Sequence, residues 1–499
     1  MESLGQQVWD AVLSGTGLTQ SLLALALSRS NKRILHLDAN DFYGEHEAAL
    51  SLQEADAWAN AHAGNTLNSD TRPIFQRASV WKHLDAEAQG LSFPRAYSLA
   101  LAPQIVYTKS NLLSQLVSSR AYRQVEFLAV GSFFVFNRAG AASNRGFSRI
   151  PSSREDVFAA QSIPARSKRA LMKFLKFVVD YDSEDQKPIW QEKADESLSS
   201  YLADAFKLDA DLRDSLIALT LALDEKITVK DGLAKLHRHL TSTGLFGPGF
   251  CAVYPKWGGL SEVAQVGCRA GAVGGGIYML DTVVTRSESG EDSDISLQLS
   301  KGVTVKTPIF VTSQQTGSAD TQRIARLVVI LNSSLELLFR SSVEGTPTPA
   351  VAVVAFPPDS LGDTHAPVYA FVHSSDTGEC PKGQSVIYLT VLAASGVDSS
   401  HILDIALTEL IQHNAPSACV LYKMYYEQVA SDRQPIITPQ RSATVFEFPS
   451  PSLGLSFDDT SLDAVKEAWK LVMKNDAVDD EYMKFEDREG MEEEDVVFD

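Results

Sequence analysis

The sequence VWDAVLSGTGLTQSLLALALSRSNKRILHLD, at residues 8–38, decides the fold. Its first apolar run, residues 8–13, is typical of a short strand, and a glycine turn follows it. An apolar helix begins at Ser21, and a second strand over residues 33–37 ends at Asp38. Strand, glycine turn, helix, strand and acid stand in the order of a Rossmann unit. The sequence therefore predicts an α/β fold built on a βαβ unit.

The glycine turn departs from a complete dinucleotide-binding motif. Gly15 and Gly17 stand at the first two glycine positions, but Gln20 occupies the third. In a working site the first glycine makes the turn, the second lets the backbone approach the pyrophosphate, and the third lets helix and strand pack closely. Gln20 should hinder that packing, so we expect a degenerate motif, ending at Asp38, and no bound cofactor. The scaffold is predicted to be flavoprotein-like (Rossmann-type, FAD/NAD(P)-binding-like) but used for another purpose.

Composition restricts the class of protein. The 499 residues, 44% hydrophobic and 21% charged, suffice for two or three globular domains. Because no run of eighteen apolar residues occurs, no transmembrane helix is expected. Few and scattered cysteines exclude a disulfide framework and a zinc site, and they favour a reducing, cytoplasmic compartment; they are Cys251, Cys268, Cys380 and Cys419.

The net charge of −19 is unevenly distributed. Residues 476–499 carry twelve acids and two bases, so about −10 lies there and about −9 in the remaining chain. We expect a disordered acidic tail, because like charges repel and few apolar residues are available to bury. Such a tail can keep the protein soluble or attract a basic partner. Nothing in the sequence predicts a basic groove, so nucleic acid is excluded as a partner.

A change in character divides the chain. From about residue 151 to 240 amphipathic helices predominate, whereas strand-like segments resume after Phe250, and a closing helix is predicted over 461–475. The predicted strands are residues 276–285, 303–312, 326–332, 350–356, 367–373 and 386–392. The prediction is a small helical domain inserted into the α/β one, with an irregular stretch at residues 46–100. The expected domains are residues 1–110 with 241–475 (α/β, discontinuous), residues 111–240 (mainly helical) and residues 476–499 (acidic tail).

Catalytic and metal-binding patterns are missing from the sequence. It contains no H-E-x-x-H, G-x-S-x-G or P-loop motif. His237 and His239 are two residues apart, so on a helix they would point to different sides and could not share a metal ion. We therefore expect no metal site and no enzyme activity of its own. A flavin-dependent oxidoreductase of the amine-oxidase type remains the alternative that the scaffold allows.

A second region of the sequence carries a family resemblance. Residues 254–262 read Tyr-Pro-Lys-Trp-Gly-Gly-Leu-Ser-Glu, and residues 274–280 read Gly-Gly-Gly-Ile-Tyr-Met-Leu. Together with the glycine turn, the His-Leu-Asp at 36–38 and the Tyr-Gly at 43–44, they resemble the superfamily of Rab escort proteins and Rab GDP-dissociation inhibitors. The resemblance implies a flavoprotein-like fold that carries no flavin, binds GDP-bound Rab GTPases and shields their prenylated C-termini.

The same resemblance implies a Rab-binding platform. Tyr43, Glu262, Arg269, Tyr278 and Met279 match it by position. An acid and a base seven residues apart share one face if their segment is helical. They can then bind complementary charges on a partner, or they can simply pair with each other. The chain departs from the family pattern at three places: Glu45 follows Tyr-Gly, one residue is inserted before the acid at 262, and Ala264 replaces a common proline.

The resemblance further favours the escort branch. Phe158 and Arg169, eleven residues apart, match the pair with which escort proteins dock the catalytic heterodimer of Rab geranylgeranyltransferase. Pro164 lies between them, so we expect the pair on neighbouring helices. The alternative is a core phenylalanine and a solvated arginine. The branch implies handling of the geranylgeranyl lipid of the Rab and transient membrane contact; the alternative within the superfamily is a GDP-dissociation inhibitor.

Overall fold

The computed structural model describes most of the chain. It covers residues 2–486 except 65–70, 138–145, 152–153, 160–162, 225, 248, 290–293, 315, 319–321, 342–345, 363, 395, 431–433 and 441–442. Most of the predicted acidic tail, from residue 487 on, therefore lies outside the described residues.

The predicted βαβ unit forms the centre of a six-stranded sheet. β1 pairs in parallel with β2, with Val12 opposite Leu35, and α1 connects them. The strand order is β11-β2-β1-β15-β23-β22, and only the last pair is antiparallel. The bounds are β1 Ala11–Ser14, α1 Leu18–Leu27, β2 Ile34–Leu37, β11 Ile277–Met279, β15 Ile309–Ser313, β22 Ile436–Gln440 and β23 Ala443–Phe448. The Rossmann-type α/β prediction is confirmed.

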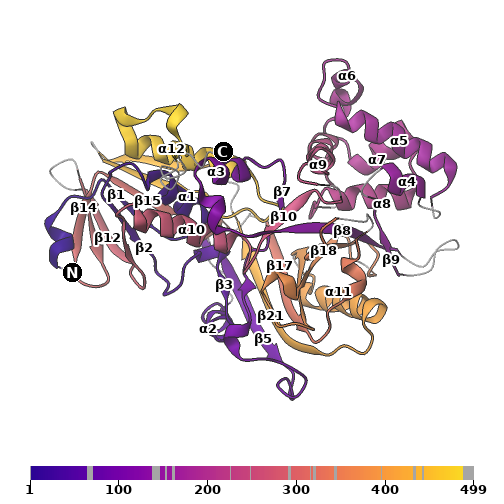
Figure 1. Ribbon diagram of the computed structural model, residues 1–499, viewed down its shortest axis with the longest axis horizontal. Coiled ribbons are helices and arrows are strands. Elements are labelled where there is room, and N and C mark those ends of the chain that lie inside the picture. The colour runs from indigo at the N-terminus through magenta and orange to yellow at the C-terminus, as the bar shows by residue number, and fades with distance from the viewer. Residues whose placement is uncertain are drawn as a thin grey trace, which may run out of the picture.

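A second, larger sheet lies beside the first (Figure 1). Its order is β5-β21-β17-β20-β19-β18-β8-β10-β7, with β9 paired to β8. The bounds are β5 Phe75–Lys82, β7 Val106–Tyr107, β8 Phe127–Asn137, β9 Gly146–Arg149, β10 Ala252–Pro255, β17 Arg323–Leu331, β18 Val351–Phe356, β19 Val368–Ser374, β20 Ser385–Leu392 and β21 Val420–Val429. Helix α11, Ser399–Asn414, buries Leu403, Leu407 and Leu410 against one face of this sheet.

Consecutive helices are inserted between β9 and β10 and form a separate lobe (Figure 1). They are α4 Arg154–Ala159, α5 Ala165–Val179, α6 Lys187–Trp190, α7 Leu198–Phe206, α8 Ala210–Leu219 and α9 Val229–Ser242. Phe174 and Leu198 of this lobe belong to the same core cluster as Phe133 of β8 and Phe371 of β19. The predicted helical insertion is confirmed. The division into domains remains a proposal, in which the helical unit would begin near Arg154 because β8 and β9 belong to the large sheet.

The remaining elements border these layers. They are β3 Ala49–Leu50, α2 Leu52–Ala61, β4 Thr71–Pro73, β6 Leu99–Ala100, α3 Asn111–Ser118, α10 Leu260–Val273, β12 Val284–Ser289, β13 Ile295–Leu299, β14 Thr304–Thr307, β16 Thr316–Ser318 and α12 Thr460–Met473. Among the described residues, no helix is both long enough and apolar enough to cross a membrane.

Two expectations about secondary structure are wrong. Residues 46–100 are not irregular: they include α2, whose N-terminus has a capping box in which the Ser51 hydroxyl and the Glu54 carboxylate each accept a backbone N–H. The Ser-x-x-Glu pattern was a usable signal. The predicted tail also begins too early, because Met483 is 1% exposed and the Tyr482 ring lies 5.1 Å from the ring of Trp469.

Gln20 does not hinder packing of α1. Its amide is buried and folds back to donate a hydrogen bond to the carbonyl oxygen of Ser14, at 3.4 Å. Leu22 and Leu23 pack in one core cluster with Leu13 of β1. The side chain at the third motif position is therefore accommodated beneath the turn, and the predicted hindrance is wrong.

Close approach of helices occurs instead between α1 and α10. A Cβ atom added to Gly267 of α10 would lie 2.5 Å from the carbonyl oxygen of Ser21 in α1. One added to Gly271 would lie 3.1 Å from the Cβ atom of Ala24. Glycines on α10 thus let it press directly on the backbone of α1, which fixes where the outer face of α10 stands.

Candidate functional site

Acidic side chains of the protein itself lie against the glycine turn. The Leu18 N–H, at the N-terminus of α1, donates to Glu47 Oε2 at 3.1 Å. A Cβ atom added to Gly15 would lie 2.5 Å from Glu45 Oε2. In dinucleotide-binding proteins this helix terminus binds the anionic pyrophosphate. Because carboxylates already lie there, the turn as folded does not fit a dinucleotide.

The acid at the end of β2 is used to hold the turn together. Asp38 Oδ2 accepts hydrogen bonds from the backbone N–H of Thr16 at 2.7 Å and from its hydroxyl at 2.5 Å. Asp38 Oδ1 accepts two more, from the backbone N–H and the side-chain amide of Asn40. Burial raises the pKa of Asp38, and its hydrogen bonds with Thr16 and Asn40 oppose that shift. Its position was predicted correctly, but in this fold it braces a loop rather than offering its oxygens to a ribose.

His36 stabilises the same turn from β2. The Gly15 carbonyl can only accept, so His36 Nε2 donates its proton there, at 2.6 Å. The ring lies 4.7 Å from the ring of Tyr278 and is fully buried. Burial lowers the pKa of His36 to about 4. The imidazole is therefore neutral at physiological pH.

Acidification is expected to destabilise the protein through His36. The unfolded chain binds this proton near pH 6.5 and the folded chain near pH 4, so between these values the unfolded state holds more protons. Stability is then lost as the pH falls through that window, by about 2 kcal/mol between pH 7.5 and pH 5. His36→Gln, which cannot be protonated, should show a correspondingly flatter pH dependence in urea unfolding. Equal pH dependence of the two proteins would contradict the prediction.

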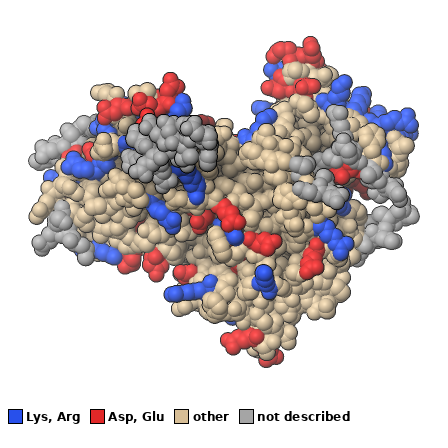
Figure 2. Space-filling model, viewed as in Figure 1, with Lys and Arg blue, Asp and Glu red and all other residues tan. Residues whose placement is uncertain are grey.

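Helix α10 presents the predicted acid and base on one face. Arg269 is exposed and Glu262 half-buried, about 10 Å apart along the axis. Burial raises the pKa of Glu262, and the charge of Arg269 opposes that shift. Among the described residues the two side chains form no ion pair with each other, and Arg269 acts on Glu262 only through its charge, so they do not simply bridge each other. Figure 2 shows acidic and basic side chains gathered over the region of α10.

The predicted aromatic residues meet beside α10. The rings of Tyr43 and Tyr278 lie 6.2 Å apart. A Cβ atom on Gly271 of α10 would lie 2.5 Å from the Tyr278 hydroxyl, so this ring packs directly on the helix. Met279, half-buried, follows on β11, and its carbonyl accepts the Asp38 N–H at 3.0 Å. Tyr43, Tyr278 and α10 are therefore brought together from three separate segments of the chain.

Sequence reasoning missed two exposed residues here. Gln265 lies between Glu262 and Arg269 on the same face of α10, as its spacing already implied. Trp257, just before the helix, is 52% exposed at φ +73°, and its N–H donates to the Thr377 carbonyl. An aromatic residue preceding two glycines was the available signal. An exposed tryptophan whose backbone is fixed in the left-handed region is typical of functional surfaces.

The second predicted pair lies on the helical lobe. Phe158 on α4 is 65% exposed, so the alternative of a core phenylalanine is wrong. Arg169 is exposed on α5, which begins after Pro164, and the Lys168 ammonium donates to the Phe158 carbonyl at 2.7 Å. The pair thus occupies neighbouring helices as expected. Figure 2 shows basic side chains along α5.

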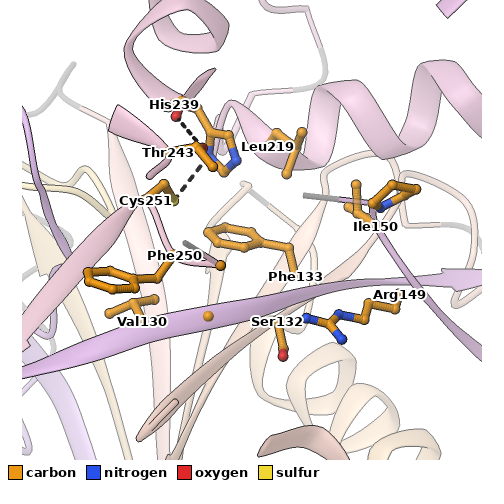
Figure 3. A pocket seen from close by; sticks show the side chains of 13 residues that line it. Val130, Ser132, Phe133, Arg149, Ile150, Leu219, His239, Thr243, Phe250 and Cys251 are labelled. Atoms are coloured by element: carbon orange, nitrogen blue, oxygen red, sulfur yellow. Dashed lines mark hydrogen bonds between the residues drawn. The ribbon is translucent and has the colours of Figure 1, made fainter. Parts of the chain in front are cut away.

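A buried cysteine–histidine pair lies where the helical lobe meets the large sheet (Figure 3). Cys251 Sγ is 3.7 Å from His239 Nδ1, beside Phe133, in a cavity of about 20 Å³. Burial raises the pKa of Cys251 to about 12 and lowers that of His239 to about 4. The thiol is therefore protonated and the imidazole neutral, so this pair does not supply a nucleophilic thiolate.

Comparison with known proteins shows a family to which this chain is similar. A family model described as "GDP dissociation inhibitor" matches residues 5–395. The "Rab proteins geranylgeranyltransferase component A" of Saccharomyces cerevisiae is 30% identical over 76% of this chain and 61% of its own length. This chain spans about three fifths of the length of the curated relatives it matches first (61% and 63%).

Solved structures agree on the fold. A Rab GDI from Plasmodium falciparum superposes with a TM-score of 0.66 at 17% identity, over 93% of this chain and 98% of the other. An oxidoreductase from Methanosarcina mazei superposes with a TM-score of 0.57 at 12% identity, over 92% and 99%. A flavoprotein-like architecture is thereby confirmed.

Proposed function

The chain belongs to the GDP dissociation inhibitor family, and from that membership we propose that it is a Rab escort protein, a non-catalytic accessory component of Rab geranylgeranyltransferase. It would bind GDP-bound Rab GTPases, present them for prenylation and deliver the prenylated product to membranes. The observation that carries this proposal is the face of α10, where Glu262 and Arg269 stand unpaired with each other beside Tyr43 and Tyr278.

The chemistry of that face suits a protein partner. An exposed guanidinium and a half-buried carboxylate can pair with opposite charges on a globular surface, and the neighbouring aromatic and methionine side chains supply apolar contact area. Gly267 and Gly271 seat α10 on α1 and Tyr278, so the platform is preorganised. This arrangement supports binding through Tyr43, Glu262, Arg269, Tyr278 and Met279.

The contribution to prenylation would be positional. A Rab held on α10, with the transferase docked at Phe158 and Arg169, keeps its cysteine tail near the catalytic site. The acceptor cysteine and the lipid would react in the catalytic site of the transferase, so no residue of this chain would act as an acid or a base in the reaction. To carry a Rab from the transferase to a membrane, the protein would reside in the cytoplasm and contact the membrane transiently. The acidic glycine turn argues against the flavin-dependent alternative.

Geranylgeranyl transfer to a purified Rab by the catalytic heterodimer tests the proposal. Transfer should depend on adding this protein. Rab binding without stimulation would instead identify a GDP-dissociation inhibitor, which recycles Rabs that are already prenylated. If the protein neither binds the Rab nor stimulates transfer, both proposed functions are overturned.

Arg169→Ala is expected to weaken docking of the transferase by roughly tenfold while Rab affinity stays unchanged, because an interface arginine contributes mainly to its own contact. Binding of the heterodimer and of the Rab can be measured separately by titration. Lys230→Ala, which removes an exposed base of α9 in the same lobe, is the matched control. An equal loss of affinity for the heterodimer and for the Rab would contradict the assignment of Arg169 as a docking residue for the transferase.

A further inference from the structure

Four arginines from distant parts of the chain line one groove. Arg29 follows α1, Arg120 and Arg123 lie at the short helix η4 (Ala121–Gln124), and Arg269 lies on α10. The groove has a volume of about 540 Å³, and the described residues that line it include no acid. In a chain with a net charge of −19, such a concentration of positive charge is unexpected and calls for an anionic ligand.

The backbone is strained where it delivers one of these arginines. Arg120 has φ +63°, in the left-handed region that arginine rarely adopts. Its Nε atom is buried and has no hydrogen-bond partner. A desolvated guanidinium nitrogen without an acceptor costs free energy, which a carboxylate bound in the groove would recover.

The C-terminal part of the chain already lies along the edge of this groove. The Phe485 ring lines it, 4.6 Å below the guanidinium of Arg29, and the Phe485 N–H donates to the Ser118 carbonyl. Arg29 Nη1 donates to the Glu486 carbonyl at 2.6 Å. The next residues in the sequence, 487–499, include seven acids and one base.

We propose that the arginine groove binds the acidic segment that follows Glu486 in the same chain. Opposite charges and the bidentate geometry of arginine with carboxylates favour this ligand. Anchoring at Phe485 makes the association intramolecular, so a modest affinity suffices for occupancy. The class of ligand is an Asp/Glu-rich peptide, and its partners are Arg29, Arg120, Arg123 and Arg269.

One consequence concerns the platform and rests on the proposed function. Arg269 faces both the groove and the Rab-binding surface, so the acidic segment would compete with acidic groups of a Rab for it. Neutralising the segment should then raise Rab affinity by roughly two- to tenfold. The segment would act as a built-in competitor that favours partners able to displace it.

A fluorescent peptide of residues 487–499, measured by anisotropy, tests the groove without any Rab. The receptor is the full chain with its own acidic run neutralised by Glu492→Gln, Glu493→Gln, Glu494→Gln and Asp495→Asn. This receptor should bind the peptide, and the wild-type chain should bind it several-fold more weakly because its own segment competes. Adding Arg123→Gln, alone or with Arg120→Gln, should weaken binding by roughly two- to thirtyfold.

The controls separate this inference from the proposed function. Arg340→Gln removes an exposed arginine far from the groove in sequence and should leave peptide binding unchanged. Higher salt should weaken binding to the neutralised receptor. No binding to that receptor, or equal binding to the Arg123→Gln receptor, would overturn the inference. Peptide binding without any Rab binding would leave it standing while the proposed function falls.

Discussion

Replacing Glu262 and Arg269 together with alanine is expected to weaken binding of a GDP-bound Rab by roughly 30- to 1,000-fold, because two central charged anchors at a protein interface are lost. Glu262 is half-buried, so a partner's cation would pair with it in a site that is already partly desolvated. Arg269 is exposed and carries a fixed charge. Isothermal titration with a Rab loaded with GDP measures the change.

The matched control removes one acid and one base elsewhere. Glu336→Ala with Arg340→Ala, both exposed at the short helix η6 (Glu336–Phe339) and its C-cap, should leave Rab affinity unchanged. Circular dichroism and thermal unfolding check that each variant is folded. Wild-type affinity in the Glu262 and Arg269 variant would show that the platform lies on another surface.

Gly267→Val is expected to lower the free energy of unfolding by about 1–3 kcal/mol, because added methyl groups overfill a tight contact. The added Cβ atom would lie 2.5 Å from the carbonyl oxygen of Ser21, and backbone cannot move aside as a flexible side chain can. Urea unfolding measures the loss. Since α10 must tilt away from α1 to relieve the contact, Rab affinity should fall in the same variant.

Ala272→Val is the control for valine itself. Ala272 lies on the exposed side of the same helix, so this variant shows only the weaker helix propensity of valine, about 0.5 kcal/mol. Equal destabilisation by the two substitutions would mean that the contact between α1 and α10 is looser than its geometry indicates.

Local patterns predicted much of the secondary structure. The strands predicted over 350–356, 367–373 and 386–392 correspond to β18, β19 and β20 within one residue at each end. Helix α11 was not predicted, although Leu403, Leu407 and Leu410 recur at helical spacing, which was the available signal. Strand β21 was also not predicted; its buried polar residues Glu427 and Gln428 bind Arg323 and Arg326 of β17.

The two candidate sites depended on different kinds of information. The residues of the platform came from a family resemblance, and helical spacing placed Glu262 and Arg269 on one face. The meeting of Tyr43 with Tyr278 could not be predicted from spacing, because 235 residues separate them in the sequence. The sequence predicted no basic groove for nucleic acid, and it could not predict the arginine groove, because the four arginines come from three distant segments of the chain.

By itself the sequence determined the βαβ unit, the helical insertion and the partial loss of the dinucleotide motif, since periodicity, glycine positions and strand-end acids act over a few residues. Only the tertiary structure decided which side chain lies at the turn where a dinucleotide would place its diphosphate, and where positive charges come together. Glu47 reaches the N-terminus of α1 because the chain folds back there, and Arg29, Arg120, Arg123 and Arg269 meet because α1, η4 and α10 pack together. Electrostatic interactions act through space, so a charge pattern follows the packing of the chain and not the order of its residues.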